Sequence, residues 1–262
     1  MPITCPVSLP DLTTGEFGGL DYVVMGHAFA SHRELGRLAD ETIYQSDLTA
    51  RLLSAGIPAI REVPVTVSFR GFSKIYLLDL VVGNRAIYEL KTVTMLTGEH
   101  EAQLLNYLFM LDGRRGKLVN FRPASVETRF VNAPSSLAER RTVGVLSVAW
   151  QGPTDLCDLV VELLRDWGTG LELSLHRQAV IHLLGGETQV SQLLPLHRAE
   201  VELGNQRFDL VTSDAALRFT AHEAPPPHFA LQCVHLLRLS PLRSLHWINI
   251  ARQNVTFTTV NR

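Results

Sequence analysis

Cysteine is scarce in this chain, and the few cysteines present are far apart. The 262 residues include only Cys5, Cys157 and Cys233, with no CxxC pair. This pattern argues against a disulfide framework, a zinc site and an iron–sulfur cluster. We therefore expect free buried thiols in a reducing compartment.

Long apolar runs and an excess of one charge are also missing. No stretch approaches the roughly 18 apolar residues of a membrane span, so no membrane partner is expected. The opening MPITCPVSLPDLTTG has no basic start and no apolar run, which does not match a secretory signal. We expect a cytoplasmic protein. The formal charge of −2 neither demands nor excludes a polyanionic partner, because binding depends on local patches.

Hydrophobic periodicity predicts an α/β fold. Residues 1–20 are rich in Pro, Gly and Thr and are expected to be irregular, and a helical pattern follows from about Gly26 to Ala55. The turn residues Gly83-Asn84-Arg85 separate two apolar strands and predict a hairpin. The remaining predicted elements are strands over 59–69, 75–82, 86–91, 116–121 and 128–131 and a helix over 98–111.

The second half of the chain reads as a copy of the first, after a polar connector over 132–142. Residues 102–131 align without a gap with 231–260, and four identities result, at Gln103/Gln232, Asn120/Asn249, Val126/Val255 and Val131/Val260. Upstream, Asp79 meets Asp209, whereas Glu89 meets Phe219 and Lys91 meets Ala221. A chance match of two apolar patterns is the alternative. We predict two domains, 1–132 and 133–262, the second lacking the glutamate and the lysine.

Three charges stand inside the apolar hairpin IYLLDLVVGNRAIYELKTV, residues 75–93. With the turn at 83–85, Asp79 lies opposite Glu89, and opposed residues have Cβ atoms about 5 Å apart. Two poorly hydrated carboxylates at that distance retain a proton unless a cation lies between them. Lys91 follows Glu89 by two residues and projects from the same face. A solvated Glu–Lys salt bridge is the simpler alternative for such a pair.

That arrangement suits hydrolysis of a phosphodiester. A divalent ion held by Asp79, Glu89 and a backbone carbonyl polarises the phosphate and lowers the pKa of a bound water. Lys91 can position the hydroxide or offset the charge that develops on phosphorus. Carboxylate ligands favour Mg²⁺, or Mn²⁺ in its place.

Two helical segments contribute further candidates. Gln103 and Tyr107 are four residues apart, on one helical face, and can point at the substrate or at ligand waters. Glu41 and Tyr44 share a face of the first helical segment, where Glu41 can add a third carboxylate to the metal. The alternatives are an ordinary buried tyrosine for Tyr107 and a capping or solvated acid for Glu41.

Taken together, these residues resemble the PD-(D/E)XK nuclease superfamily, and within it the GxxExxY family. Gly36 precedes Glu41-Thr-Ile-Tyr44 at a longer spacing than the family name implies, and LLDLVV, IYELKTV, EHEAQLLNYL and GKLVNF continue the match over about residues 26–131. Gln103-x-x-x-Tyr107 also resembles a motif of RecB-like members. Leu78 stands before Asp79, where the superfamily motif has proline.

The resemblance implies a restriction-endonuclease-like core, a mixed central sheet flanked by helices, with Mg²⁺-dependent cleavage of nucleic acid. It implies that Asp79 and Glu89 are metal ligands, that Lys91 is the catalytic lysine and that Glu41 is the helical acid, with Gln103 and Tyr107 lining the site. DNA is favoured over RNA by this analogy alone. Many RecB-like relatives carry an iron–sulfur cluster, and this chain lacks the cysteines to bind one, which is a further departure.

A basic cluster follows the predicted helix at 98–111. It offers a track for backbone phosphates, or else a solvated basic loop, and its members are Arg114, Arg115, Lys117, Arg122 and Arg129. The leading hypothesis is a metal-dependent deoxyribonuclease. The alternatives are a non-cleaving nucleic-acid-binding or scaffold protein and a metal-independent sugar or nucleotide enzyme, although no Gly-rich phosphate loop is present. The oligomeric state stays open, with a homodimer as one option.

Overall fold

The chain divides into two compact units in the computed structural model, which describes residues 2–262. Unit 1 comprises residues 2–68 and 73–136, and unit 2 comprises Phe69–Phe72 and Leu137–Arg262. The sequence predicts a single division, at residue 132. The assignment of Phe69–Phe72 to the second unit has no signal in the sequence.

Unit 1 is built on a six-stranded sheet with the order β1-β2-β3-β4-β5-β6, in which β4 and β5 run parallel. Its elements are β1 (Ile3–Thr4), α1 (Thr14–Leu35), α2 (Glu41–Ser54), β2 (Ala59–Phe69), β3 (Phe72–Val82), β4 (Ala86–Lys91), α3 (Gly98–Met110), β5 (Arg115–Asn120) and β6 (Glu127–Asn132). The predicted hairpin and the helix that follows it are confirmed.

The N-terminal helices differ from the prediction in two ways. The irregular lead-in is wrong, because α1 begins at Thr14, where Thr13 and Glu16 form a capping box that satisfies free backbone amides. The continuous helical segment is also wrong, because the chain breaks at Gly36, whose φ of 74° is open to glycine without strain. The helical segment is therefore two helices, and Glu41 lies in the first turn of the second.

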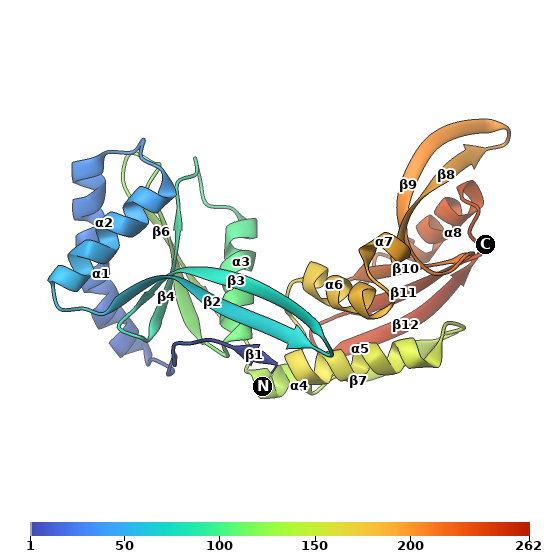
Figure 1. The fold of residues 1–262 in the computed structure, drawn as a ribbon, viewed down its shortest axis with the longest axis horizontal. Helices are drawn as coiled ribbons and strands as arrows, with labels where there is room; N and C mark the ends of the chain where they lie inside the picture. The colour runs from blue at the N-terminus through green and yellow to red at the C-terminus, as the bar shows by residue number, and fades with distance from the viewer. Residues whose placement is uncertain (1) are drawn as a thin grey trace. The chain divides into compact units, whose positions relative to one another are not determined.

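The helices of unit 1 cover both faces of its sheet (Figure 1): α1 and α2 lie on one face and α3 on the other. The first interface is a core in which Tyr44 of α2 stacks on Phe121 with ring centroids 4.4 Å apart. On the other face Gly116 lets α3 approach β5, because an added Cβ would lie 2.9 Å from Cδ1 of Leu104. The helices thus cover both faces of the sheet, and the loops that follow β4 and β5 leave it at one edge.

Unit 2 also contains a six-stranded sheet, with the order β7-β12-β11-β10-β9-β8. The connector predicted at 132–142 includes a short helix, α4 (Leu137–Arg141). The other elements are β7 (Gly144–Val148), α5 (Thr154–Trp167), α6 (Leu173–Leu183), α7 (Glu187–Val190), β8 (Ser191–Arg198), β9 (Val201–Thr212), β10 (Ala215–Thr220), α8 (Phe229–Leu239), β11 (Ser244–Ile250) and β12 (Asn254–Asn261).

The core of unit 2 has two parts. One lies under α8, where Cys233 and Leu237 pack on Phe208, Ala216 and other strand residues. The other includes Trp167 of α5, which is fully buried and contacts the rings of Phe69 and Phe72 at centroid distances of 6.0 and 6.1 Å. The tip of the β2–β3 hairpin therefore supplies two of the aromatic residues around Trp167.

The strands of the two sheets follow one another in the same order. In unit 2, β8, β9, β10, β11 and β12 occupy the places of β2, β3, β4, β5 and β6, and β10 runs parallel to β11 as β4 runs parallel to β5. One side chain repeats its bonding: Asn120 bonds both the amide and the carbonyl of Val93, and Asn249 does the same with His222.

This repeated bonding fixes which residues correspond. Lys91 pairs with Asn120 and Thr220 pairs with Asn249, so Thr220 stands at the position of Lys91. By the same register Arg218 stands at the position of Glu89. The match of 77–91 to 207–221 is therefore wrong by one residue: Asp79 corresponds to Phe208 and not Asp209, Glu89 to Arg218 and not Phe219, and Lys91 to Thr220 and not Ala221. Asn120 and Asn249 are 129 residues apart and these strand residues follow the same interval, whereas the match used an interval of 130.

Candidate active site

The hairpin of β3 and β4 brings the three predicted charges to one place. Its register pairs Leu80 with Tyr88, so that Asp79 comes next on β3 and Glu89 comes next on β4. Leu80 and Tyr88 point into the core under α1 and α2. Because side chains alternate along a strand, Asp79, Glu89 and Lys91 project to the opposite face, on the side of α3.

The side chains converge closely. Lys91 Nζ lies 2.8 Å from Glu89 Oε1 and 3.7 Å from Asp79 Oδ2. Asp79 Oδ2 accepts a hydrogen bond of 2.8 Å from the backbone amide of Leu90, where the two strands begin to separate. Glu89 is 0% exposed, and its Oε2 atom has no hydrogen-bond partner among residues 2–262. Buried polar atoms are normally satisfied, so this oxygen leaves a position for a proton, a water or a cation.

The electrostatics of this cluster favour a bound cation. The pKa of Glu89 is raised to about 8, first because burial disfavours its charged form and second because Asp79 repels it, with Lys91 acting in the opposite direction. Burial also raises the pKa of Asp79. Burial by itself lowers the pKa of Lys91, but the neighbouring carboxylates outweigh it and raise that pKa above its usual value. The amine is therefore a cation, and the acids share a proton unless further positive charge is added.

Glu41 approaches the cluster from α2. Burial raises the pKa of its carboxyl, while Lys91 and a hydrogen bond from the Thr92 amide lower it. Tyr44 anchors the same helix, because its hydroxyl donates to the carbonyl oxygen of Gly36 at 2.6 Å. Nevertheless, residues 2–262 contain no group of three His, Cys, Asp or Glu side chains close enough to hold one metal ion. The structure thus joins Asp79 and Glu89 but leaves Glu41 outside their immediate group.

An aromatic and amide group borders the cluster on the other side. Gln103 Nε2 donates to the hydroxyl of Tyr107 at 3.1 Å, as their spacing on α3 allows. The pKa of Tyr107 is raised, chiefly by burial and also by Glu89 and Asp79. The ring of Tyr107 contacts that of Tyr76 edge to face, 6.2 Å between centroids.

Lys74 and Tyr76 were missed by the sequence analysis. Lys74 Nζ lies 4.7 Å from the centroid of the Tyr76 ring, so that β3 extends the site with a cation and an aromatic face. The two residues are two apart on β3 and share a face, but Asp79 comes three residues after Tyr76, and strict alternation would place it on the opposite face. The ring contact of Tyr76 with Tyr107 is what places this pair beside the site, so strand periodicity gave no signal for it.

The basic residues do not form the expected track. Lys117 is 4% exposed and pairs with Asp21 at 2.6 Å, so it cannot reach a phosphate in this structure, and that prediction is wrong. Arg114 and Arg115 lie at the start of β5, whereas Lys91 pairs with Asn120 at its other end. They are therefore remote from the charged cluster.

Arg122 is the one predicted basic residue near the cluster, and it serves the backbone. Its guanidinium donates to the carbonyl oxygens of Thr92 at 3.1 Å and of Arg37 at 2.8 Å. It thereby ties the loop after β4 to the loop between α1 and α2. Arg129 pairs with Glu101 of α3.

The donor set fits a hard divalent ion. Asp79 and Glu89 supply carboxylate oxygens, one of them the unpartnered Glu89 Oε2, and no soft sulfur ligand stands among them. A cation at these oxygens would relieve the repulsion that raises both carboxyl pKa values.

Comparison with known proteins agrees with this geometry. Residues 19–131 match a family model described as the PD-(D/E)XK nuclease superfamily. No curated protein and no solved structure matches the chain. The matched segment contains the whole charged cluster, all of α2 and α3 and most of α1. None of the helices described for residues 2–262 combines the length and apolarity that crossing a bilayer requires.

Proposed function

We propose that unit 1 is a metal-dependent nuclease that hydrolyses phosphodiester bonds of DNA. The observation that carries this proposal is the convergence of Asp79, Glu89 and Lys91 on one face of the β3–β4 hairpin. The family match over residues 19–131 supports nuclease chemistry in general. The choice of DNA, and the likeness to GxxExxY and RecB-like proteins, are parts of the proposal that rest on sequence resemblance.

Asp79 and Glu89 would hold Mg²⁺, or Mn²⁺ in its place, with Glu41 contributing through a bridging water. The ion would supply Lewis acidity to a phosphate oxygen and to a bound water. A water-mediated role suits Glu41. Its carboxyl interacts electrostatically with both Lys91 and Asp79 and yet lies outside their immediate group.

Lys91 acts as a cation. Its raised pKa keeps the ammonium protonated near neutral pH, so it does not remove a proton from water. Its three donors instead hold Glu89 at 2.8 Å and can orient the attacking oxygen or offset charge on the phosphate. Burial to 8% exposure strengthens that effect, because the local dielectric is low.

The residues next to the acids position the nucleic-acid strand. Gln103 and Tyr107 offer an amide and a hydroxyl beside the acids, and Tyr76 and Lys74 continue outward along β3. An exposed base can stack on an aromatic face while lysine contacts the backbone. We assign these four residues to substrate binding.

Unit 2 is, in this proposal, a copy that has lost the catalytic set. The shared strand order and the repeated asparagine bonding support duplication. Arg218 and Thr220 replace the acid and the lysine, so each chain should bind one catalytic metal ion. Isothermal titration with Mn²⁺ checks this, and two equivalent sites per chain would contradict it.

The test of activity is cleavage of plasmid and linear DNA with Mg²⁺, Mn²⁺ or EDTA. We expect metal-dependent cleavage that falls at least about 100-fold in Lys91→Ala and Glu89→Gln, the range seen when one group stabilising a transition state is removed. Glu99→Gln, which changes an exposed acid on α3, should cleave normally. Cleavage that persists in Lys91→Ala would refute the assignment. DNA binding without cleavage in any metal would support the non-catalytic scaffold instead.

A further inference from the structure

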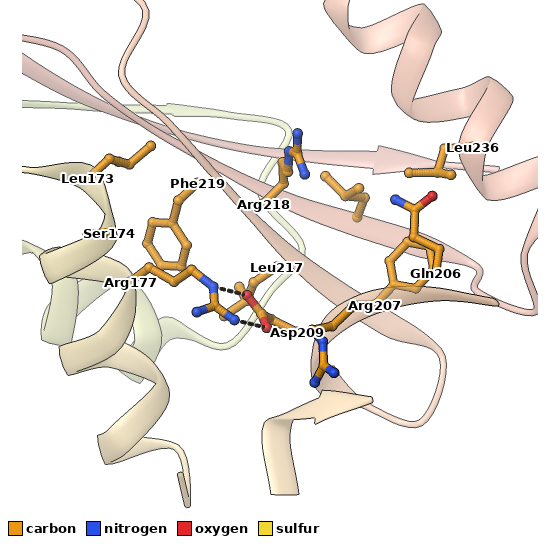
Figure 2. Close-up of a pocket in the computed structure, with 12 residues that line it drawn as sticks. Leu173, Ser174, Arg177, Gln206, Arg207, Asp209, Leu217, Arg218, Phe219 and Leu236 are labelled. Carbon is orange, nitrogen blue, oxygen red and sulfur yellow. Dashed lines mark hydrogen bonds and ion pairs between the residues drawn. The ribbon is translucent and has the colours of Figure 1, made fainter. Parts of the chain in front are cut away.

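Unit 2 contains a cavity at the place where unit 1 has its charged cluster. The cavity has a volume of about 290 Å³ and opens between β9 and β10, beside α6 and α8 (Figure 2). The register of these strands pairs Leu217 with Asp209 as its last pair, so the strands separate there. In unit 1, β3 and β4 separate at Asp79 in the same way.

The charge at this strand separation is reversed between the two units. Unit 1 presents two carboxylates that suit a cation. The lining of the unit 2 cavity includes three arginines, Arg177, Arg207 and Arg218, and a single carboxylate, Asp209. Arg218 occupies the position of Glu89. Phe208, the residue before Asp209, occupies the position of Asp79.

One of the three arginines is already neutralised. Arg177 contacts Asp209 through two hydrogen bonds of 2.6 Å each, and Figure 2 shows this pair in the wall of the cavity. Arg207 and Arg218 form no ion pair within the described residues, and both side chains are exposed. Figure 2 shows Arg218 directed away from the Arg177–Asp209 pair, so the two unpaired cations are not adjacent. The cavity therefore offers two separate sites for negative charge.

The remaining wall is mainly apolar. Leu173, Leu217, Phe219 and Leu236 contribute to it, and Gln206 adds one amide. An apolar wall with a few polar groups is typical of small-ligand sites, and the volume is near the lower end of their range. Inorganic phosphate alone would leave this wall without a partner.

We propose that this cavity binds one nucleotide unit of a DNA strand, with its two flanking phosphates at Arg207 and Arg218 and its base or sugar against the apolar wall. The inference rests on the proposed function, because it supplies a second contact for the strand that unit 1 cleaves. Unit 1 meets phosphate through a metal ion, whereas unit 2 meets it through guanidinium groups. Arginine suits this role because its fork of donors matches phosphate oxygens.

The experiment measures binding without cleavage. A fluorescent single-stranded oligodeoxynucleotide is titrated in EDTA with the full chain carrying Glu89→Gln, and with the same chain carrying Arg207→Ala or Arg218→Ala in addition. Each arginine variant should raise Kd about 5- to 30-fold and reduce the slope of log K against log salt by roughly 0.7, the value for one lost phosphate contact on a single strand. Arg218→Glu, which restores the acid of unit 1, should weaken binding further.

Arg243→Ala is the matched control, because its side chain is 83% exposed and lies outside the cavity in the same unit. It should change Kd less than twofold. Equal binding by the cavity variants and this control would overturn the inference, as would displacement of the oligonucleotide by a mononucleotide at similar concentration, which would indicate a site for free nucleotides. Circular dichroism checks that each variant is folded.

Failure of this inference is distinguishable from failure of the nuclease proposal. With Glu89 intact, Arg218→Ala should raise KM for an oligonucleotide and leave kcat unchanged, since it touches no reacting group. A chain that never cleaves, yet loses binding in the arginine variants, would refute the nuclease and keep the cavity assignment. A chain that cleaves DNA with an unchanged KM in these variants would refute the cavity assignment and keep the nuclease.

Discussion

Replacing Glu89 with glutamine should remove both a pH-dependent stability term and the response of unit 1 to Mg²⁺. In the metal-free protein the pKa of Glu89 is about 8, above its ordinary value of 4.5, so the folded state holds a proton that the unfolded state releases between these values. The stabilisation is complete below pH 4.5 and is lost as the pH rises toward 8. Glutamine keeps the shape and does not titrate.

The size of the effect follows from that shift. Each pKa unit corresponds to about 1.4 kcal/mol, and because Asp79 shares the proton we expect a loss of a few kcal/mol across this pH range. For a domain of this size that corresponds to a fall in Tm of roughly 10 °C. At pH 8, Mg²⁺ at 100-fold above its Kd should restore about 2.7 kcal/mol to the parent protein. Glu89→Gln should show neither change.

Thermal unfolding in EDTA and in Mg²⁺, followed by circular dichroism at several pH values, measures these terms. Glu99→Gln is the control, because it removes an exposed acid and should behave as the parent does. A Glu89→Gln protein that keeps the full loss of stability with rising pH would refute the assigned electrostatics. Equal stabilisation of parent and variant by Mg²⁺ would show that the metal binds elsewhere.

Three further changes test other parts of the fold by the same unfolding assay. Lys117→Met should cost about 3–5 kcal/mol, because it leaves Asp21 buried without its cation, and a loss below 1 kcal/mol would contradict that pairing. Gly116→Ala should cost about 1–3 kcal/mol by crowding Leu104, and a neutral result would mean that α3 shifts freely. His176 is buried with a pKa lowered to about 4 by burial, so unit 2 should lose up to about 3 kcal/mol as the pH falls from 6.5 to 4, and His176→Phe should not.

The hairpin and its charges were predictable because their signals are local. Alternation over 75–82 and 86–91 and the turn at 83–85 fixed the register, and the register placed Asp79 beside Glu89. The helix at 98–111 had a clear period as well. These elements are confirmed, and they carry the candidate site.

Long-range partners were not predictable from local pattern. Lys117 looks like a surface cation in sequence, but its partner Asp21 is 96 residues away on α1. In the second half the segment before α8 was matched at an interval of 130 residues, although the two asparagines that repeat their bonding are 129 apart. A slip of one residue exchanges the two faces of a strand, so Phe219 was assigned to a position that Arg218 occupies.

The placement of Phe69 and Phe72 beside Trp167 has a practical consequence for dissecting the molecule. A fragment cut at residue 137 would carry Trp167 without the two phenylalanines that cover it, and would expose a tryptophan that is 0% exposed in the intact chain. Separate expression of the second unit should therefore give an aggregation-prone product. A fusion that grafts residues 69–72 back onto it is the minimal soluble alternative.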